Sequence, residues 1–329
     1  MTERASVYER TQVGVEVTPG TAVACPTQLV AASFGLKVGE NTDTFTPIGS
    51  KYPVITVLNR EWASMPITGK PAYDELIYPL VTLLDPGSSP TTLTGTPNAY
   101  QWDFTTNPSG PDAIKTLTVQ RGSSVRAARA ANGFMKSFGY TLSKMRGTSI
   151  KGEFMGTALT DGITMTATPT ILPMVPVNPG DVSVYVDSSF GGIGTTKLGR
   201  CFDVDWQLNN KADGVFALDA STGTSFAATV ETKPTLEMTL LVEADSAGMA
   251  FLSGYRSSTT YFIRVEAVGP LIATGNNYLF RMDMAAKVNQ PQEFKDEQGA
   301  WAIGFKFAVV VDSSLNAFTA RVVNTRSSL

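Results

Sequence analysis

The chain has 329 residues, of which 43% are hydrophobic and only 17% charged, and its net charge at pH 7 is −3. This length allows one large domain or two modest ones, and the apolar content allows a real core. The small acidic charge excludes a global basic footprint for nucleic acid. The scarcity of charge favours a surface covered by uncharged polar groups or by other subunits.

The residue types argue against a catalytic site or a metal site. The sequence contains no histidine, which removes the commonest general base and the commonest metal ligand. Cys25 and Cys201 are its only cysteines, and two thiols make neither a disulfide framework nor a four-cysteine zinc site. Two free thiols in a reducing compartment are therefore expected. We predict no catalytic site, no metal and no cofactor, and no run of about 20 apolar residues suits a membrane span.

Strand patterns dominate the first part of the chain. Residues 11–29 are rich in Thr, Pro, Gly and Val and are expected to form an extended arm. Alternation from Phe34 to Val38 is typical of a half-buried strand, and residues 54–58 and 61–68 predict two more. The stretch from Pro71 to Leu84 has a core-facing apolar stripe and predicts a helix. A proline inside it should kink this helix or delay its start.

The middle of the chain is divided by proline-rich segments. Residues 85–111 hold five prolines and predict a long loop with at most one short strand, at 100–105. Residues 134–145 and 150–159 alternate in polarity around a turn and predict a hairpin. The stretch 168–180 carries four prolines and is the best candidate for a linker.

The second part opens with the cleanest amphipathic strand, in which apolar and polar residues alternate from Phe202 to Asn209. A strand at 235–242 precedes a helix whose expected N-cap is Asp245. A further strand at 261–266 is expected to end at the Gly269-Pro270 pair.

The two parts of the chain repeat one succession of elements, which favours a duplicated domain. Strand 34–38 resembles 202–206, the helix after Pro71 resembles the helix after Asp245, 117–122 resembles 264–269, and hairpin 134–159 resembles hairpin 278–312. We predict a mostly β fold of two tandem units, 1–167 with the arm and the long loop, and 181–329 with a C-terminal tail, joined by linker 168–180. The alternative is that β-rich chains produce such successions by chance.

One row of polar side chains is a candidate functional surface. Asp203, Asp205, Gln207 and Asn209 lie on one face of one strand because side chains alternate. The two carboxylates could bind a cation, but no third ligand is evident nearby. A row that faces solvent or a channel is the better interpretation.

The second candidate surface is a pair of opposite charges. Arg121, Arg126 and Arg129 form the one basic cluster, on a loop or short helix between two strands. Single-stranded nucleic-acid binding would favour aromatic residues between the basic ones, and this cluster has none. We therefore expect these arginines to face another subunit. The acidic group Glu293, Asp296 and Glu297, at the tip of the last hairpin, is a plausible partner across that interface.

Two stretches resemble a known family. Residues 12–24, which read QVGVEVTPGTAVA, look like the opening of many tail tube (major tail) proteins of long, flexible-tailed bacteriophages. Residues 234–269, with a strand, a short helix and an Arg-containing strand, are also similar. The resemblance implies β-sandwich or half-barrel units, each with a flanking short α-helix. Such subunits close into rings that stack as a hollow tube for DNA ejection.

The resemblance also implies partners and a location. These are further copies of the chain, the tail terminator, tape measure and baseplate proteins, and transient non-specific contact with DNA, in a virion tail assembled in the host cytoplasm. If each half is one unit, three copies make a pseudo-hexameric ring, whereas the alternative is a ring of six copies. A carbohydrate-binding or adhesin-like β-sandwich of the virion is the competing function. An exposed Trp and Tyr cluster would favour it, but Trp62, Trp102, Trp206 and Trp301 are scattered.

Overall fold

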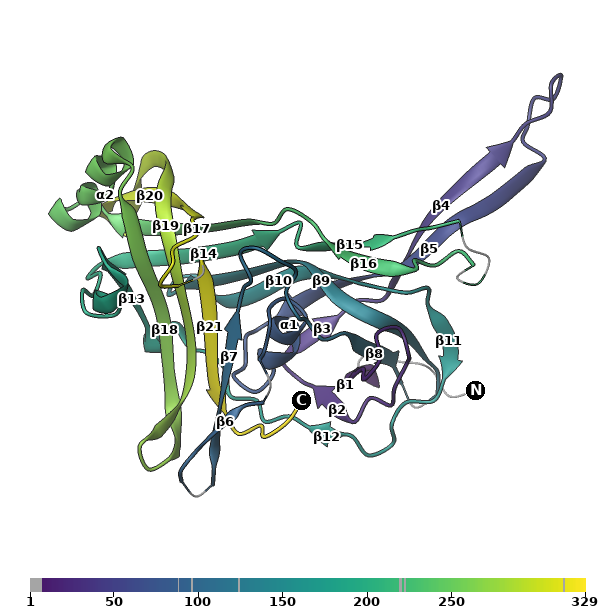
Figure 1. Ribbon diagram of the computed structural model, residues 1–329, viewed down its shortest axis with the longest axis horizontal. Coiled ribbons are helices and arrows are strands. Elements are labelled where there is room, and N and C mark those ends of the chain that lie inside the picture. Colours follow the sequence, from purple (N-terminus) through teal and green to yellow (C-terminus); the bar gives the residue numbers. More distant parts are fainter. Residues whose placement is uncertain are drawn as a thin grey trace.

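The computed structural model describes residues 8–87, 89–95, 97–123, 125–218, 221, 223–315 and 317–329. The fold is mostly β, as predicted, with two α-helices, α1 (Ile77–Val81) and α2 (Ser246–Ser257) (Figure 1). Among the described residues, nineteen strands share one hydrogen-bonded network and two more form a separate ribbon. Neither described helix is long and apolar enough to cross a membrane.

The strands vary in length from two to 22 residues. Their bounds are β1 Arg10–Val15, β2 Thr27–Leu29, β3 Ala32–Phe34, β4 Lys37–Phe45, β5 Ile55–Gly69, β6 Thr91–Leu93, β7 Ala99–Thr105, β8 Leu117–Gly122, β9 Ala127–Ser143, β10 Gly147–Gly156, β11 Thr160–Ile163, β12 Thr170–Ile171, β13 Val182–Asp187, β14 Cys201–Asn209, β15 Ala212–Val215, β16 Ala228–Glu231, β17 Thr235–Glu243, β18 Thr260–Ala273, β19 Asn276–Glu297, β20 Ala300–Val309 and β21 Phe318–Asn324.

One antiparallel sheet, here called the main sheet, runs through both halves of the chain. Its first half is the edge formed by β3 and β4, followed by β5, β10 and the end of β9. Its second half is β14, β17, β20 and the end of β19. Pairing of β9 with β14 joins the halves, with Leu142 opposite Val204 and Tyr140 opposite Trp206. The sheet crosses the upper part of Figure 1.

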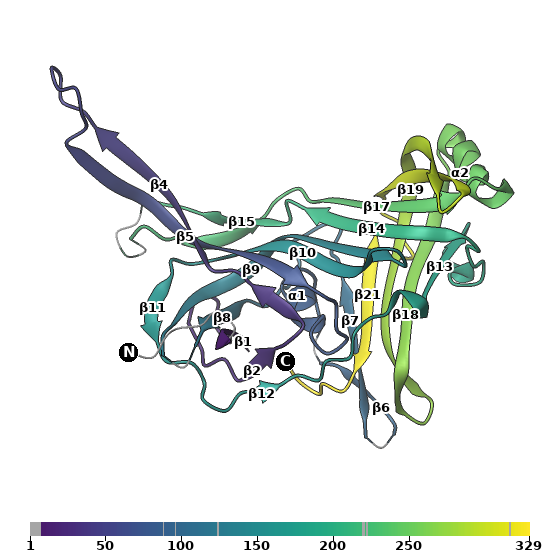
Figure 2. The same ribbon diagram turned by 180° about the vertical axis from the view of Figure 1, so that it is seen from behind.

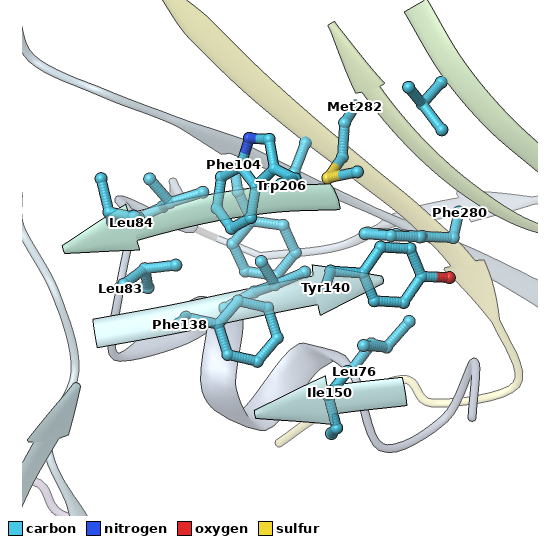
Figure 3. Close-up of a cluster of buried hydrophobic side chains, with 14 of the residues drawn as sticks. Leu76, Leu83, Leu84, Phe104, Phe138, Tyr140, Ile150, Trp206, Phe280 and Met282 are labelled. Atoms are coloured by element: carbon cyan, nitrogen blue, oxygen red, sulfur yellow. The ribbon is translucent and has the colours of Figure 1, made fainter. Parts of the chain in front are cut away.

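The long strands β9 and β19 each leave the main sheet and enter a second layer. The beginning of β9 pairs with β8 and β11, and the beginning of β19 pairs with β18 and β21. Apolar side chains of the two layers and of α1 fill the space between them. Figure 3 shows this core, where Tyr140 and Phe280 meet edge to face at 5.1 Å.

Local sequence explains the elements that were predicted correctly. In β14 the alternating residues Val204, Trp206 and Leu208 are buried, while the polar ones between them are half-buried. Helix α2 begins where the Asp245 carboxylate accepts a hydrogen bond from the Gly248 amide at 2.8 Å, which satisfies a free donor of the first turn. Helix α1 starts late, at Ile77, so that its proline occupies the first turn, where a missing N–H costs little.

The same order of strands occurs twice. In the first half it is β1, β8, β9, β10, β5 and β3–β4, and in the second half β13, β18, β19, β20, β17 and β14. Helix α1 follows β5, and α2 follows β17. The two hairpins also share a bulge. Strand β9 has one extra residue opposite the Glu153–Phe154 step of β10, and β19 has one extra residue opposite the Lys306–Phe307 step of β20.

Several segments differ from the sequence-based expectation. Residues 11–29 are not a free arm, because β1 pairs with β8 and β2. The long loop 85–111 contains the β6–β7 hairpin, and β7 pairs with β21 of the second half. Segment 168–180, expected as a linker, is mostly exposed, but Leu172 and Val177 are buried, and β12 within it pairs with β2. Strand β18 continues through Gly269-Pro270 by shifting its register there.

The element that does project is the hairpin of β4 and β5, which extends away from the body of the molecule in both ribbon views (Figures 1 and 2). Residues 54–58 and 61–68, expected as two strands, form the single 15-residue strand β5. We call the outer part of this hairpin, residues 39–60, the arm.

Candidate assembly surfaces

The main sheet ends in two open edges. Among the described residues, β3 and β4 pair only with β5. Pairing of β19 with β18 stops at Lys287, so residues 288–297 pair with β20 alone. The two edges lie at opposite ends of the main sheet (Figure 1). Unpaired N–H and C=O groups along such edges are templates for another strand.

The arm is a second surface that lacks packing partners within its own chain. Its exposed large hydrophobic residues include Phe45, Ile48, Tyr52, Val54, Ile55, Val57 and Leu58. Ile48 and Val54 are 107% and 68% exposed. An isolated two-stranded hairpin is marginally stable in water, and a row of apolar side chains of this size marks a contact surface. The exposed apolar side chains therefore make the arm a candidate contact surface.

The polar face of the main sheet is the third surface. Asp203, Asp205, Gln207 and Asn209 lie together on this face, half-buried, as their alternation predicts. Asp205 accepts hydrogen bonds from Thr141 and Gln207, each at 3.1 Å. These hydrogen bonds orient Asp205 and Gln207 within the row.

Charges on this face nearly cancel. On β10, β14, β17 and β20 its charged residues are Glu153, Asp203, Asp205, Glu237 and Glu243, against Lys151 and Lys306. Two arginines reach these carboxylates from adjacent turns, Arg146 to Asp203 and Arg200 to Glu243. The described residues contain no group of three or more side chains placed to hold a metal ion. On these four strands the balance is slightly acidic, and Lys37 of β4 borders the same face beside Lys151 and Gln207, so the face does not concentrate charge of either sign.

Of the three candidate arginines, Arg126 lies in the loop between β8 and β9, as expected, whereas Arg121 and Arg129 lie within these two strands. Arg121 forms an ion pair with Glu9 at 3.0 Å and donates a hydrogen bond to the Phe34 carbonyl at 3.0 Å. Arg126 is paired with Asp161, which raises the pKa of its guanidinium. Arg129 lies within β9 and is half-buried.

The acidic candidates Glu293, Asp296 and Glu297 lie in β19, because the strand continues to Glu297 and the turn is only two residues long. Within one chain they do not meet the arginines, since the β19–β20 tip and the β8–β9 hairpin lie at opposite sides of the molecule (Figures 1 and 2). An interaction between these two groups therefore requires a second copy.

Sequence reasoning missed an aromatic pair at the same tip. Phe294 and Trp301 stack with ring centroids 5.6 Å apart and planes 13° apart, and Trp301 is 61% exposed. Of the other tryptophans, Trp102 and Trp206 are buried and Trp62 is half-buried against Phe216. The tryptophans thus form no common exposed platform for a sugar. Two apolar aromatics within a charged stretch were the available signal.

Comparisons with known proteins give little. No protein family matches the sequence, and no curated protein is similar to it. Among solved structures, the tail tube of SPP1, determined by solid-state NMR and electron cryo-microscopy, aligns over 46% of this chain and 81% of its own, with 14% identity and a TM-score of 0.29. This is a weak partial likeness to a tail tube protein, and the surfaces above are interpreted from this chain's own geometry.

Proposed function

We propose that this chain is a structural subunit that polymerises through its sheet edges into rings, which stack into the hollow tube of a bacteriophage tail. The observation that carries the proposal is the pair of open edges at opposite ends of one antiparallel sheet. A sheet with two complementary free edges either aggregates or closes on itself through further copies. Closure removes both edges at once.

The repeated strand order supports a specific ring. We infer that the halves are duplicated units and that the β9–β14 pairing reproduces inside one chain the contact between neighbouring units. Each chain then supplies two of six positions. The main sheet of each chain has eight strand positions, because β3 and β4 follow one another along β5 and share one position. Three copies would then close a barrel of 24 strand positions. A ring of six copies is the alternative.

The remaining surfaces suit such a tube. The polar face of the main sheet would line the channel, and its near neutrality would let DNA pass, because each Lys or Arg contact to phosphate adds salt-dependent affinity. The arm would reach a neighbouring subunit or the adjacent ring and bury its apolar side. Ends of the tube would contact the terminator, tape measure and baseplate proteins of the tail.

Electron microscopy of the purified chain tests the proposal. Rings or tubes in negative stain, and a native mass spectrum with three copies per ring, are the expected results. Six copies would retain the assembly function and refute the pairing of halves within one ring. Monodisperse monomers at high concentration would overturn the proposal and favour the carbohydrate-binding alternative, which a glycan array then addresses.

A further inference from the structure

We infer that the open edge of β3 and β4 pairs with residues 291–297 of β19 in the next copy, in the register that the chain already uses between β9 and β14. This inference rests on the proposed function and specifies the surface and the pairing through which copies join. The occupant of each open edge is thus a second copy of this chain.

The shared bulge determines which residues of the two halves correspond. It places Phe154 of β10 in the position of Phe307 of β20. Their neighbours across the sheet are Met65 and Met238, so the correspondence extends into β5 and β17 with like residues in both places.

The same correspondence identifies the edge residues. Ile67 and Leu240 each follow their methionine by two residues. Ile67 lies opposite Phe34, and Leu240 lies opposite Val204. Phe34 therefore occupies the position of Val204.

On the other side of the sheet, Tyr140 lies opposite Ile150 and Phe294 opposite Ile303. Phe294 therefore occupies the position of Tyr140, and Asp296 that of Leu142.

Transferring the internal pairing gives the contact between copies. Because Val204 faces Leu142 in the β9–β14 junction, Phe34 would face Asp296 of the next copy. Leu36 would face Phe294, and Lys37 would lie opposite the bulged pair Gln292–Glu293. This register sets a lysine against a glutamate, which adds a favourable cross-strand pair.

Burial supports the transfer. Tyr140 and Leu208 are 0% and 6% exposed in the internal junction. Phe294, in the position of Tyr140, is 40% exposed, and Val38, in the position of Leu208, is 44% exposed. At these two positions the open edges carry apolar residues where the internal junction buries them, and the same pairing would bury Phe294 and Val38.

Charge distinguishes the two junctions. Inside the chain, Arg146 of the β9–β10 turn pairs with Asp203 of the adjoining strand, so the tip is basic and the strand acidic. At the open edges the signs are reversed. The β19–β20 tip carries Asp296, and the Phe34 carbonyl that would face it is held by Arg121 at 3.0 Å. A mispaired junction would set like charges together, which opposes the wrong partner.

Cysteine cross-linking tests the register. The variant Leu36→Cys with Phe294→Cys should form disulfides between copies under mild oxidation, because strand partners lie within disulfide range. The matched control moves one cysteine to Asn289, which lies opposite the Lys306–Phe307 step of β20 whereas Phe294 lies opposite Ile303. This is a shift of three to four residue steps, or about 12 Å, and the control should not cross-link. The single variants report any contribution of the native thiols, and gel electrophoresis without reductant separates the products.

Each outcome decides a different point. A closed covalent species whose formation needs both cysteines, with the control uncross-linked, supports the register, and its mass counts the copies. Rings or tubes that form from the double variant without cross-links, or that cross-link equally through residue 289, overturn the register and leave the proposed function standing. If the unmodified chain forms no rings or tubes in the microscope, the proposed function fails and this inference fails with it.

Discussion

A buried charge cluster holds the loop before β8 against the β15–β16 ribbon, and its central lysine is the most informative residue to replace. The Lys211 ammonium lies between the carboxylates of Asp112 and Glu231, and Lys211 and Asp112 have side chains only 3% and 1% exposed. Asp112 also accepts a hydrogen bond from the Asn107 amide, and its own amide donates to Glu231 at 2.9 Å.

Replacing Lys211 by methionine keeps the volume and removes the charge. Removing one partner of a buried ion pair costs about 3–5 kcal/mol, because the remaining carboxylates stay buried without compensation. We therefore expect the free energy of unfolding to fall by about this amount. Neutralising the carboxylates as well, with Asp112→Asn and Glu231→Gln, should restore much of the loss, since no uncompensated charge then remains.

Urea denaturation followed by tryptophan fluorescence measures the effect, at a concentration below that at which particles form. The control is Lys306→Met, which breaks the pair with Glu237 at 2.8 Å, where the side chains are 31% and 29% exposed. Exposed pairs contribute at most about 1 kcal/mol, so the midpoint should barely move. Equal losses for the two lysines would refute the reasoning, because burial would then not determine the cost.

Three further outcomes are expected. Gly254→Ala should destabilise the protein by about 1–3 kcal/mol, because its new methyl would meet the Tyr261 hydroxyl. Adding Tyr261→Phe should recover part of the loss. An undiminished melting temperature for the single variant would contradict the packing. Cys25 is buried, which raises the pKa of its thiol from 9.0 to about 12. Its alkylation at pH 8 should therefore be roughly 1,000-fold slower than in urea, and equal rates by mass spectrometry would show an accessible thiolate. Lys37→Glu should slow assembly in light scattering and Glu293→Lys added to it should restore the rate, more so at low salt; a double variant as slow as the single one argues against their pairing.

Elements with strong local signals could be predicted from the sequence. Strand β14 alternates cleanly because one of its faces is buried, and α2 has an N-cap that works through a contact three residues away. Strand β5 was divided into two because its first six residues lie in the arm and are exposed. No core face imposes alternation there, so the periodic signal disappears while the strand continues.

Long-range pairing could not be predicted. The polar row of β14 was placed on one face correctly, since that needs only alternation. The pairing of β7 with β21, and the placement of Arg121 at the Phe34 carbonyl, depend on contacts between segments far apart in the sequence. The sequence comparison matched Phe34 with Phe202 by residue type. By its pairing partners in the sheet, Phe34 corresponds instead to Val204, two positions later.

Strand β21 has a consequence for the order of folding. It pairs with β19 on one side and β7 on the other, and its Arg321 reaches Asp103, 218 residues earlier. The outer edge of β7 is therefore covered only after β21 has been synthesised, and contacts between segments so far apart in the sequence form slowly. A chain interrupted before β21 would leave both flanking strands uncovered. In the proposed assembly, we therefore expect a chain that lacks β21 not to be incorporated.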